Sequence, residues 1–257
     1  MNDLIRLEVI HRVAYIAIDR PPANALSRSL LVQLQQAVTR VKDDSAIKVA
    51  VIKGSGKMFV AGADIKEMAE TANAAGSELA KGGQAVLNDI EQSPKPFIAA
   101  LNGHCLGGGL ELAMACHLRY AVEGAKLGQP EINLGLIPGF GGTQRLTRLV
   151  GETVAMEMML TGAPLSAERA HSLRLVNRVF PAAQLDPEVR RIAELIAGKS
   201  AVATREIVGA VRAAGDVPLA EGLDFEADAF GRAFASDDKR EGIAAFIEKR
   251  EPHFKDK

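Results

Sequence analysis

Two glutamates, each beside a cluster of glycines, have carboxyl groups that could move protons. Glu111 follows three consecutive glycines, Gly107–Gly109, at the start of an apolar segment. Glu131 follows Gly128–Pro130 and precedes the turn-rich stretch Leu134–Gly142. Two neighbouring carboxyl groups can hold different protonation states, since burial and mutual repulsion separate their pKa values. Such a pair suits general acid–base chemistry, in which one group takes a proton while the other supplies one.

The segment that carries Glu111 is typical of a buried helix. From Leu110 to Ala115 all residues except Glu111 are apolar, and a helix that is apolar on all sides is buried. On a surface helix, an acid in the first turn would need no explanation beyond the helix dipole. In an interior, an ionised carboxylate costs several kcal/mol unless it is paired or protonated. We therefore favour a functional role for Glu111.

The glycines before this helix have two explanations. Without side chains, the backbone N–H groups of Gly107–Gly109 can approach a ligand oxygen at the helix start. A tight turn with close packing accounts for the same residues equally well. A lone acid such as Glu131 is usually a solvated loop residue, so its interest comes only from the presence of Glu111.

Alternating strands and helices must position these residues. The apolar runs 13–18, 49–52 and 97–101 predict buried strands. A helix that Ser27 could cap follows the first strand, with leucines and valines on one face. The stretch Thr71–Gly83 is rich in Ala and Gly and predicts either a mobile loop or a weak helix beside the ligand site.

The chain is predicted to be helical from about Leu185 to its end. The last helix is capped by Ser236, starts with two aspartates and finishes at Lys249–Arg250, which suits the helix dipole. Much of the aromatic area lies in this tail, at Phe225, Phe230, Phe234 and Phe246. Packing against a partner subunit and covering the chain's own core explain it equally well.

Composition and missing motifs exclude several classes of protein. The chain has 257 residues and a formal net charge of -1, which argues against a dedicated nucleic-acid binder. Cys105 and Cys116 have no zinc-type spacing and predict reduced thiols in the core. No phosphate loop, G-x-G-x-x-G, G-x-S-x-G or histidine cluster occurs, so we expect no metal site. No apolar signal core or run of ~20 apolar residues occurs, so we expect a cytoplasmic protein without membrane contact.

Three segments together resemble the enoyl-CoA hydratase/isomerase (crotonase) family. They are AGADIKEM at 61–68, LGGGLELAMAC at 106–116 and GQPEINLGLIPGFGGTQRL at 128–146. Each alone is only suggestive, but their occurrence in this order is highly specific. The similarity runs from RPPANALS at 20–27 to the EKREPHFK ending.

The resemblance implies a fold and an assembly. The fold would be α/β, a crotonase-like spiral of ββα turns over residues 1–190 with a helical region over 191–257. That helical region would form trimers that pair into a homohexamer. The substrate would be an acyl-CoA thioester, and no cofactor is expected because coenzyme A is part of the substrate.

The resemblance also implies roles for individual residues. The thioester oxygen would lie between the backbone N–H groups of Ala63 and Gly108. Glu111 and Glu131 match the two catalytic glutamates of the hydratases; we assign Glu111 to activating water and Glu131 to proton transfer at C2. Gly139 would help to place the water. The coenzyme A pocket would be lined by Ala61, Asp64, Ile65 and Lys66.

The expected activity is hydration of the 2-trans double bond of a short- or medium-chain enoyl-CoA, giving 3-hydroxyacyl-CoA. This step belongs to fatty acid beta-oxidation or a related degradation of acyl-CoA. Double-bond isomerisation and hydration of a branched enoyl-CoA are the nearest alternatives on this fold, but isomerases generally manage with one of the two acids. A non-catalytic or RNA-binding member is the alternative from another class, and the intact acid pair speaks against it.

Overall fold

The computed structural model describes residues 3–257. Its strands are β1 (Ile5–Ile10), β2 (Val13–Ile18), β3 (Val49–Gly54), β4 (Met58–Val60), β5 (Phe97–Leu101), β6 (His104–Leu106), β7 (Leu118–Val122), β8 (Lys126–Gly128), β9 (Leu165–Ser166) and β10 (Arg178–Phe180). Its helices are α1 (Arg28–Asp43), α2 (Ile65–Glu70), α3 (Gly76–Glu91), α4 (Gly108–Ala115), α5 (Gly142–Val150), α6 (Glu152–Thr161), α7 (Ala167–Ser172), α8 (Ala182–Ala197), α9 (Ala201–Ala213), α10 (Leu219–Phe234) and α11 (Asp237–Glu248). Short 3₁₀ helices are η1 (Asn73–Ala75) and η2 (Glu131–Leu134).

The strands form two sheets that the chain visits in turn. One sheet has six strands in the order β1-β2-β3-β5-β7-β10, and the other has four in the order β4-β6-β8-β9. Within the first, only β1 is antiparallel to its neighbour. The chain passes through three successive strand pairs, β3–β4, β5–β6 and β7–β8. The first strand of each pair belongs to the six-stranded sheet and the second to the four-stranded sheet, and a helix follows each pair. This arrangement confirms the predicted α/β spiral of ββα turns.

The elements predicted from apolar patterns are present. Runs 13–18 and 97–101 are β2 and β5, and the run at 49–52 is extended to Gly54 in β3. Ser27 caps α1, since its hydroxyl accepts the Leu30 N–H at 3.2 Å. The leucine and valine face of α1 is buried as expected. Its apolar periodicity therefore identified the correct face.

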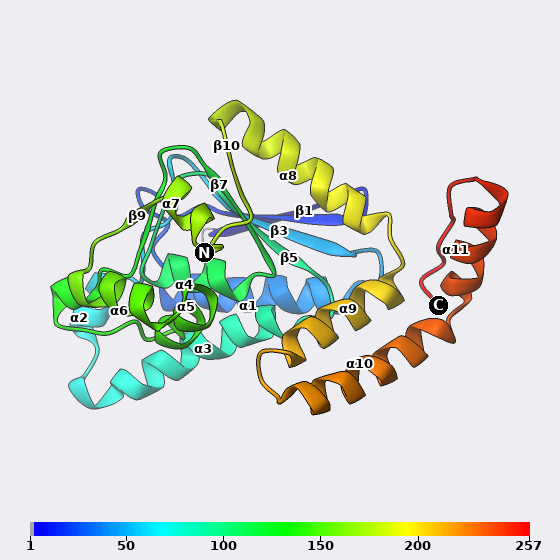
Figure 1. Ribbon diagram of the computed structural model, residues 1–257. Helices are drawn as coiled ribbons and strands as arrows, with labels where there is room; N and C mark the ends of the chain where they lie inside the picture. Colours follow the sequence, from blue (N-terminus) through cyan, green and yellow to red (C-terminus); the bar gives the residue numbers. More distant parts are fainter. Residues whose placement is uncertain (1–2) are drawn as a thin grey trace.

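Helices cover both faces of the larger sheet (Figure 1). On one face α8 packs against β2, β3, β5 and β7, burying Leu185, Val189 and Ala193. The main core, which includes α1, α3 and α4, occupies the other side. The sequence-based boundary at residue 190 falls inside α8, a continuous helix that lies on the sheet. Cys105 and Cys116 are free and buried, as predicted.

The stretch Thr71–Gly83 is ordered as helix, so the weak-helix alternative holds. Residues 73–75 form η1, and α3 begins at Gly76 without a side-chain cap. The second half of α3 buries Val86, Leu87 and Ile90 in the core. Those apolar contacts supply the stability that the Ala- and Gly-rich first half lacks.

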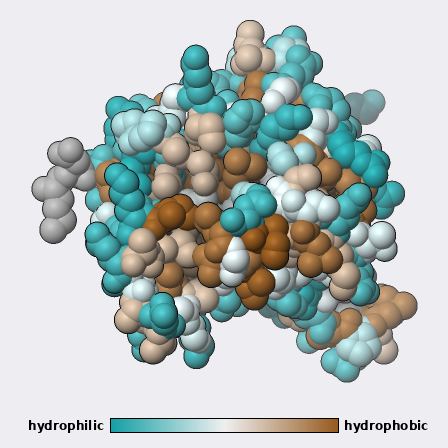
Figure 2. All heavy atoms as spheres, turned by 90° about the vertical axis from the view of Figure 1, so that its left-hand side faces the viewer, coloured by the Kyte–Doolittle hydropathy of each residue, from teal (hydrophilic) through white to brown (hydrophobic). Residues whose placement is uncertain are grey.

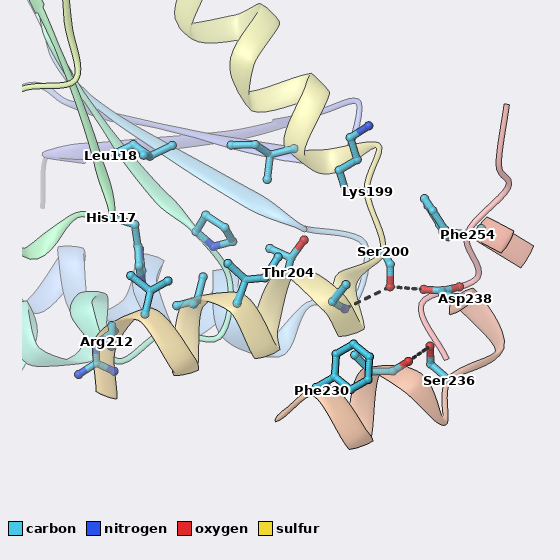
Figure 3. A pocket seen from close by; sticks show the side chains of 18 of the residues that line it. His117, Leu118, Lys199, Ser200, Thr204, Arg212, Phe230, Ser236, Asp238 and Phe254 are labelled. Atoms are coloured by element: carbon cyan, nitrogen blue, oxygen red, sulfur yellow. Dashed lines mark hydrogen bonds between the residues drawn. The ribbon is translucent and has the colours of Figure 1, made fainter. Parts of the chain in front are cut away.

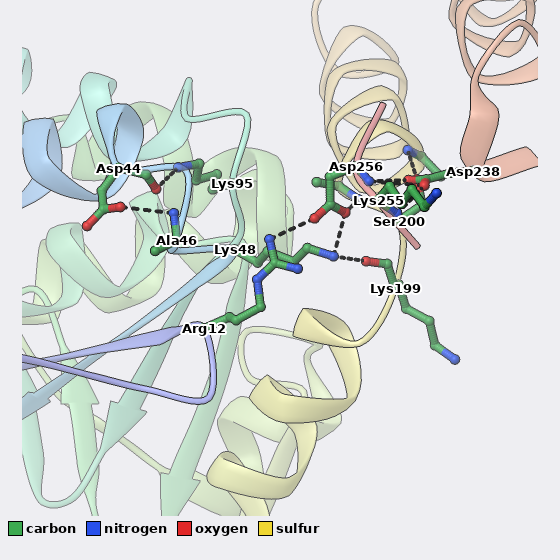
Figure 4. A network of polar contacts seen from close by, with 12 residues as sticks. Arg12, Asp44, Ala46, Lys48, Lys95, Lys199, Ser200, Asp238, Lys255 and Asp256 are labelled. Atoms are coloured by element: carbon green, nitrogen blue, oxygen red, sulfur yellow. Dashed lines mark hydrogen bonds and ion pairs between the residues drawn. The ribbon is translucent and has the colours of Figure 1, made fainter. Parts of the chain in front are cut away.

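The C-terminal helices are fastened to the sheet by a polar network, named here the C-terminal network and centred on Asp238 and Asp256 (Figure 4). Asp256 forms ion pairs with Arg12 at 2.7 Å and with the buried Lys48 at 2.6 Å. Asp238 accepts a hydrogen bond from the Ser200 hydroxyl at 2.6 Å. A buried lysine is stable only when it is paired and hydrogen-bonded, so the last residues of the chain complete the packing around Lys48.

The described chain offers neither a metal-binding cluster nor a membrane-spanning helix. Within residues 3–257, no three His, Cys, Asp or Glu side chains are grouped so that they could hold a metal ion. No helix in the same range combines the length and apolar character needed to cross a bilayer.

Candidate active site

The helix that carries Glu111 is pressed tightly into the core. It starts after Gly107, whose φ of 51° favours glycine. A Cβ on Gly109 would lie 2.2 Å from the Val60 carbonyl oxygen, so only glycine lets α4 approach β4 this closely. Every residue of α4 is buried, and Glu111 is 2% exposed. The sequence-based prediction of a buried helix with an acid in its first turn is confirmed.

The Glu111 carboxylate is held by two backbone amides. Its Oε1 accepts the N–H of Phe140 and the N–H of Gly142, each at 2.7 Å. A Cβ on Gly142 would lie 2.9 Å from that same oxygen, so the glycine permits the contact. Burial raises the pKa of Glu111 to about 7, aided by the Glu131 charge and opposed by the two amides and Arg145. The group can therefore gain or lose a proton near neutrality.

Glu131 lies close by, at the first position of η2. With its side-chain amide nitrogen facing Glu131, the buried Gln129 donates to both carboxylate oxygens of Glu131, at 3.0 and 3.1 Å. A Cβ on Gly107 would lie 2.8 Å from Glu131 Oε1, which places this carboxylate against the start of α4. Burial raises the pKa of Glu131. The structure thus brings the two predicted glutamates together.

The amides of Ala63 and Gly108 lie side by side. A Cβ on Gly108 would be 3.4 Å from the Ala63 nitrogen, and Ala63 is tied to Leu26 by an isolated parallel bridge. In the chain from residue 3 onward, neither N–H donates to a protein acceptor. Two neighbouring unpaired amides, one at the N-terminus of a helix, are suited to bind an anionic oxygen.

The turn expected to line the coenzyme A pocket has a structural aspartate at its centre. Asp64 caps α2 by accepting the Lys66 and Glu67 N–H groups at 2.9 and 3.3 Å, and it pairs with Arg20. Burial opposes ionisation of Asp64, but these donors outweigh it and lower its pKa. The side chains of Ile65 and Lys66 are exposed. Asp64 is therefore engaged within the protein, whereas Ile65 and Lys66 are open to a ligand.

The two remaining predicted residues differ in their surroundings. Ala61 is half-buried and its N–H donates to the Ala23 carbonyl at 3.0 Å. Gly139 is half-buried, and its carbonyl accepts from the Gln84 amide at 2.8 Å. A Cβ on Gly139 would meet only Ala80, at 3.7 Å. Space therefore remains beside Gly139, on the chain segment that holds Glu111.

Sequence reasoning missed the side chains that support the glutamates. Gln129 holds Glu131, and Arg145 joins the carbonyl of Phe140 to α3. On α3, Asn88 and Glu91 accept from Arg145, and Gln84 donates to the Gly139 carbonyl. Their spacing of four and three residues places them on one face of a helix, beside its apolar stripe. That pattern was readable, but its partner segment could not be identified without the fold.

Comparison with known proteins agrees with this geometry. Residues 8–257 match the family described as enoyl-CoA hydratase/isomerase. The chain is 45% identical to crotonyl-CoA hydratase of Syntrophomonas wolfei over 97% of both chains, and 46% identical to a probable enoyl-CoA hydratase of Bacillus subtilis over 98% of both. It superposes on the crystal structure of an enoyl-CoA hydratase from Bacillus anthracis with a TM-score of 0.96 at 38% identity, covering 99% of this chain and 100% of the other. This chain therefore belongs to the enoyl-CoA hydratase/isomerase family.

Proposed function

We propose that this protein is an enoyl-CoA hydratase that adds water across the 2-trans double bond of a short- or medium-chain enoyl-CoA, as in fatty acid beta-oxidation. The observation that carries the proposal is the placement of Glu111 and Glu131 beside the unpaired amides of Ala63 and Gly108. The names of the similar proteins from Syntrophomonas wolfei and Bacillus subtilis support it.

The proposed reaction uses each of these groups once. The oxygen of water forms a bond to C3 while Glu111 takes a proton from that water. The π electrons of the double bond move toward the thioester, so negative charge develops on its oxygen, where the Ala63 and Gly108 amides stabilise it. Glu131 then delivers a proton to C2. Ile65 and Lys66 bind the coenzyme A part, and Gly139 leaves room for the water. No metal or redox cofactor takes part.

Burial raises the pKa of both glutamates, and the neighbouring Glu131 charge also raises that of Glu111. The two groups titrate as a coupled pair, so the pair holds one proton over a range of pH. Hydration uses the arrangement of that proton in which Glu131 carries it.

Direct assay of hydration tests this proposal. Crotonyl-CoA and longer trans-2-enoyl-CoAs are incubated with the protein, and loss of the conjugated absorbance is followed with and without a chelator. We expect hydration that the chelator leaves unchanged. Conversion of 3-enoyl-CoA to 2-enoyl-CoA without hydration would identify an isomerase instead. Activity lost to the chelator and restored by a metal would contradict the metal-free mechanism.

The rate of hydration should depend on pH in a bell-shaped manner. Below the raised pKa of Glu131 both carboxyl groups are protonated, so no base is present. Above about 7 the pair loses its remaining proton, so no acid is available for C2. We therefore expect kcat/KM to fall on both sides, with the alkaline limb near pH 7, measured in buffers of constant ionic strength. A kcat/KM that keeps rising above that pH would contradict a one-proton pair.

We also propose that the protein forms a homohexamer built from two trimers in the cytoplasm. Phe230, Phe234 and Phe246 are exposed in a single chain. A cavity of about 900 Å³ lies between the C-terminal helices and the core, with Phe230 and Phe254 at its walls (Figure 3). Neither Glu111 nor Glu131 lines it, so we attribute it to subunit packing rather than catalysis. Exposed apolar surface of this kind marks an interaction site.

A second apolar surface supports assembly. Figure 2 shows a band of apolar side chains on the face where α2 and α6 lie in Figure 1. The exposed apolar residues of α6 and of the preceding segment 134–137 include Leu134, Ile137, Met156 and Leu160. We expect light scattering to give the mass of a hexamer, and Phe246→Asp to shift it toward smaller species because a charge would be buried in the contact. A stable, active monomer would contradict the proposal.

A further inference from the structure

Arg145 is almost completely buried in the first turn of α5. The hydrogen bonds of its guanidinium go to two other segments. Its Nη1 donates to the Phe140 carbonyl at 2.9 Å. Its Nε and Nη2 donate to Glu91 at 3.0 and 2.7 Å, and Nη2 also donates to Asn88 at 2.6 Å. The guanidinium therefore ties the segment 138–142 to α3.

This tie acts on the same peptide units that hold Glu111. Phe140 gives its carbonyl to Arg145 and its N–H to Glu111 Oε1. Gly141 has a φ of 105°, and a Cβ there would lie 2.3 Å from Arg145 Nη1, so the backbone wraps directly around the guanidinium. Gly142 then donates the second amide to Glu111. Movement of Arg145 would shift both donors.

A second contact strengthens the docking of this segment on α3. Gln84 donates to the Gly139 carbonyl at 2.8 Å. A Cβ on Gly83 would lie 2.3 Å from the Phe140 ring, which shows how closely the ring lies against the helix. The Gly139 carbonyl and the Phe140 ring are thus fixed directly by α3, and the Phe140 carbonyl is fixed to it through Arg145. Among residues 3–257, Arg145 is the only charged side chain that binds the Phe140 carbonyl, whereas the neutral Gln84 binds the Gly139 carbonyl.

We propose that Arg145, held by Glu91 and Asn88, is a positioning residue for hydration: it fixes the segment 138–142 so that two amides keep the Glu111 carboxylate aimed at the water. The proposal goes beyond the two-glutamate mechanism and rests on the proposed hydratase function. Arg145 itself touches no reacting atom. It acts through Phe140 and Gly142, and a small misplacement of a catalytic group costs up to ~10² in rate.

Arg145→Lys and Arg145→Gln test the proposal, with Arg148→Gln as the matched control. Arg148 lies on the same helix, but its guanidinium contacts only Gln144 in the described chain. We expect kcat for crotonyl-CoA hydration to fall about 10- to 100-fold in both Arg145 variants, with KM unchanged. Arg148→Gln should match the unmodified protein. Circular dichroism and thermal melting establish that each variant is folded.

The pH profile separates positioning from a general loss of structure. The charged groups that face Glu111 are Glu131 from η2 and Arg145 from α5. The two amides and Arg145 lower the pKa of Glu111, so losing them moves the alkaline limb to higher pH. Lysine keeps the positive charge, so a shift in Arg145→Lys reports loosened amides. Arg145→Gln, which loses the charge as well, should show the larger shift.

Two milder variants keep the test valid if the Arg145 variants do not fold. Glu91→Gln and Asn88→Ala each leave Arg145 in place and remove part of its anchor. We expect losses of kcat between those of the control and of Arg145→Lys, with the same direction of pH shift. If all four variants match Arg148→Gln in kcat and in pH profile, the positioning role is wrong. If the unmodified protein does not hydrate enoyl-CoA, the proposed function itself is wrong.

Discussion

Replacing either glutamate by glutamine should lower kcat at least ~10²-fold while leaving KM for the enoyl-CoA little changed. Glutamine keeps the size and polarity of Glu111 and Glu131 but cannot exchange a proton. In the Glu111→Gln variant the side-chain amide oxygen would still accept the Phe140 and Gly142 amides, so the fold around α4 should persist. The residues that we assign to coenzyme A are untouched. Steady-state kinetics with crotonyl-CoA measure both quantities.

The double variant and proton exchange show whether the two acids serve one transition state. Groups that act together are strongly non-additive, so the double variant should lose much less than the product of the single losses. Exchange of the C2 proton with solvent should fail in Glu131→Gln even where the thioester still binds. Near-normal hydration by Glu131→Gln would make Glu131 an ordinary loop acid and refute the two-glutamate mechanism.

Removing one amide donor from the anion site should have an effect of similar size. Gly108 is the first residue of α4, a position where proline suits the helix geometry; its ring removes the N–H and puts Cδ in the place of that hydrogen. Losing one donor to a developing oxyanion costs ~10²–10³ in kcat. We therefore expect Gly108→Pro to retain the helix and to lose hydration by that factor.

Gly108→Ala is the matched control for this variant. Its Cβ would meet Leu26 Cδ1 at 3.2 Å and the Ala63 nitrogen at 3.4 Å, a crowding that proline shares, but alanine keeps the N–H. The ratio of kcat between the two variants therefore reports the loss of the donor together with the ring carbon that replaces it. Equal kcat values in two folded variants would show that the Gly108 amide does not stabilise the thioester oxygen.

The sequence predicted the fold, but not the contacts that support the two glutamates. Apolar period and capping identified β2, β5, α1 and the buried α4, because these signals are local. The resemblance named Glu111 and Glu131, and the structure brings them together. The coenzyme A role of the turn 61–66 stays a prediction, and Asp64 within it caps α2 and pairs with Arg20.

The supporting contacts could not be predicted because they join distant segments. Arg145 and Glu91 are 54 residues apart, and nothing local marks either as the other's partner. The same holds for the first half of α3, whose Ala- and Gly-rich sequence has weak intrinsic preference. Its helical state depends on the apolar contacts of Val86, Leu87 and Ile90 further along the helix. Tertiary packing decides whether such a region is helical, and the local sequence pattern carries no information about that packing.

The C-terminal network has a consequence for the order in which a ribosome-bound chain can fold. Arg12 and Asp256 are 244 residues apart, which is roughly 10–50 s of synthesis at about 5–20 residues per second. During that interval Lys48 has no Asp256 to pair with, so its ammonium group stays hydrated and the adjoining edge of the sheet stays open. Helices α9 and α10 pack on each other, but the contacts of Asp256 with Arg12, Lys48 and the Ala201 N–H form only when Asp256 emerges. If the protein forms the homohexamer that we propose, this region of its association surface would be completed last, which would delay contacts between neighbouring chains on one messenger RNA.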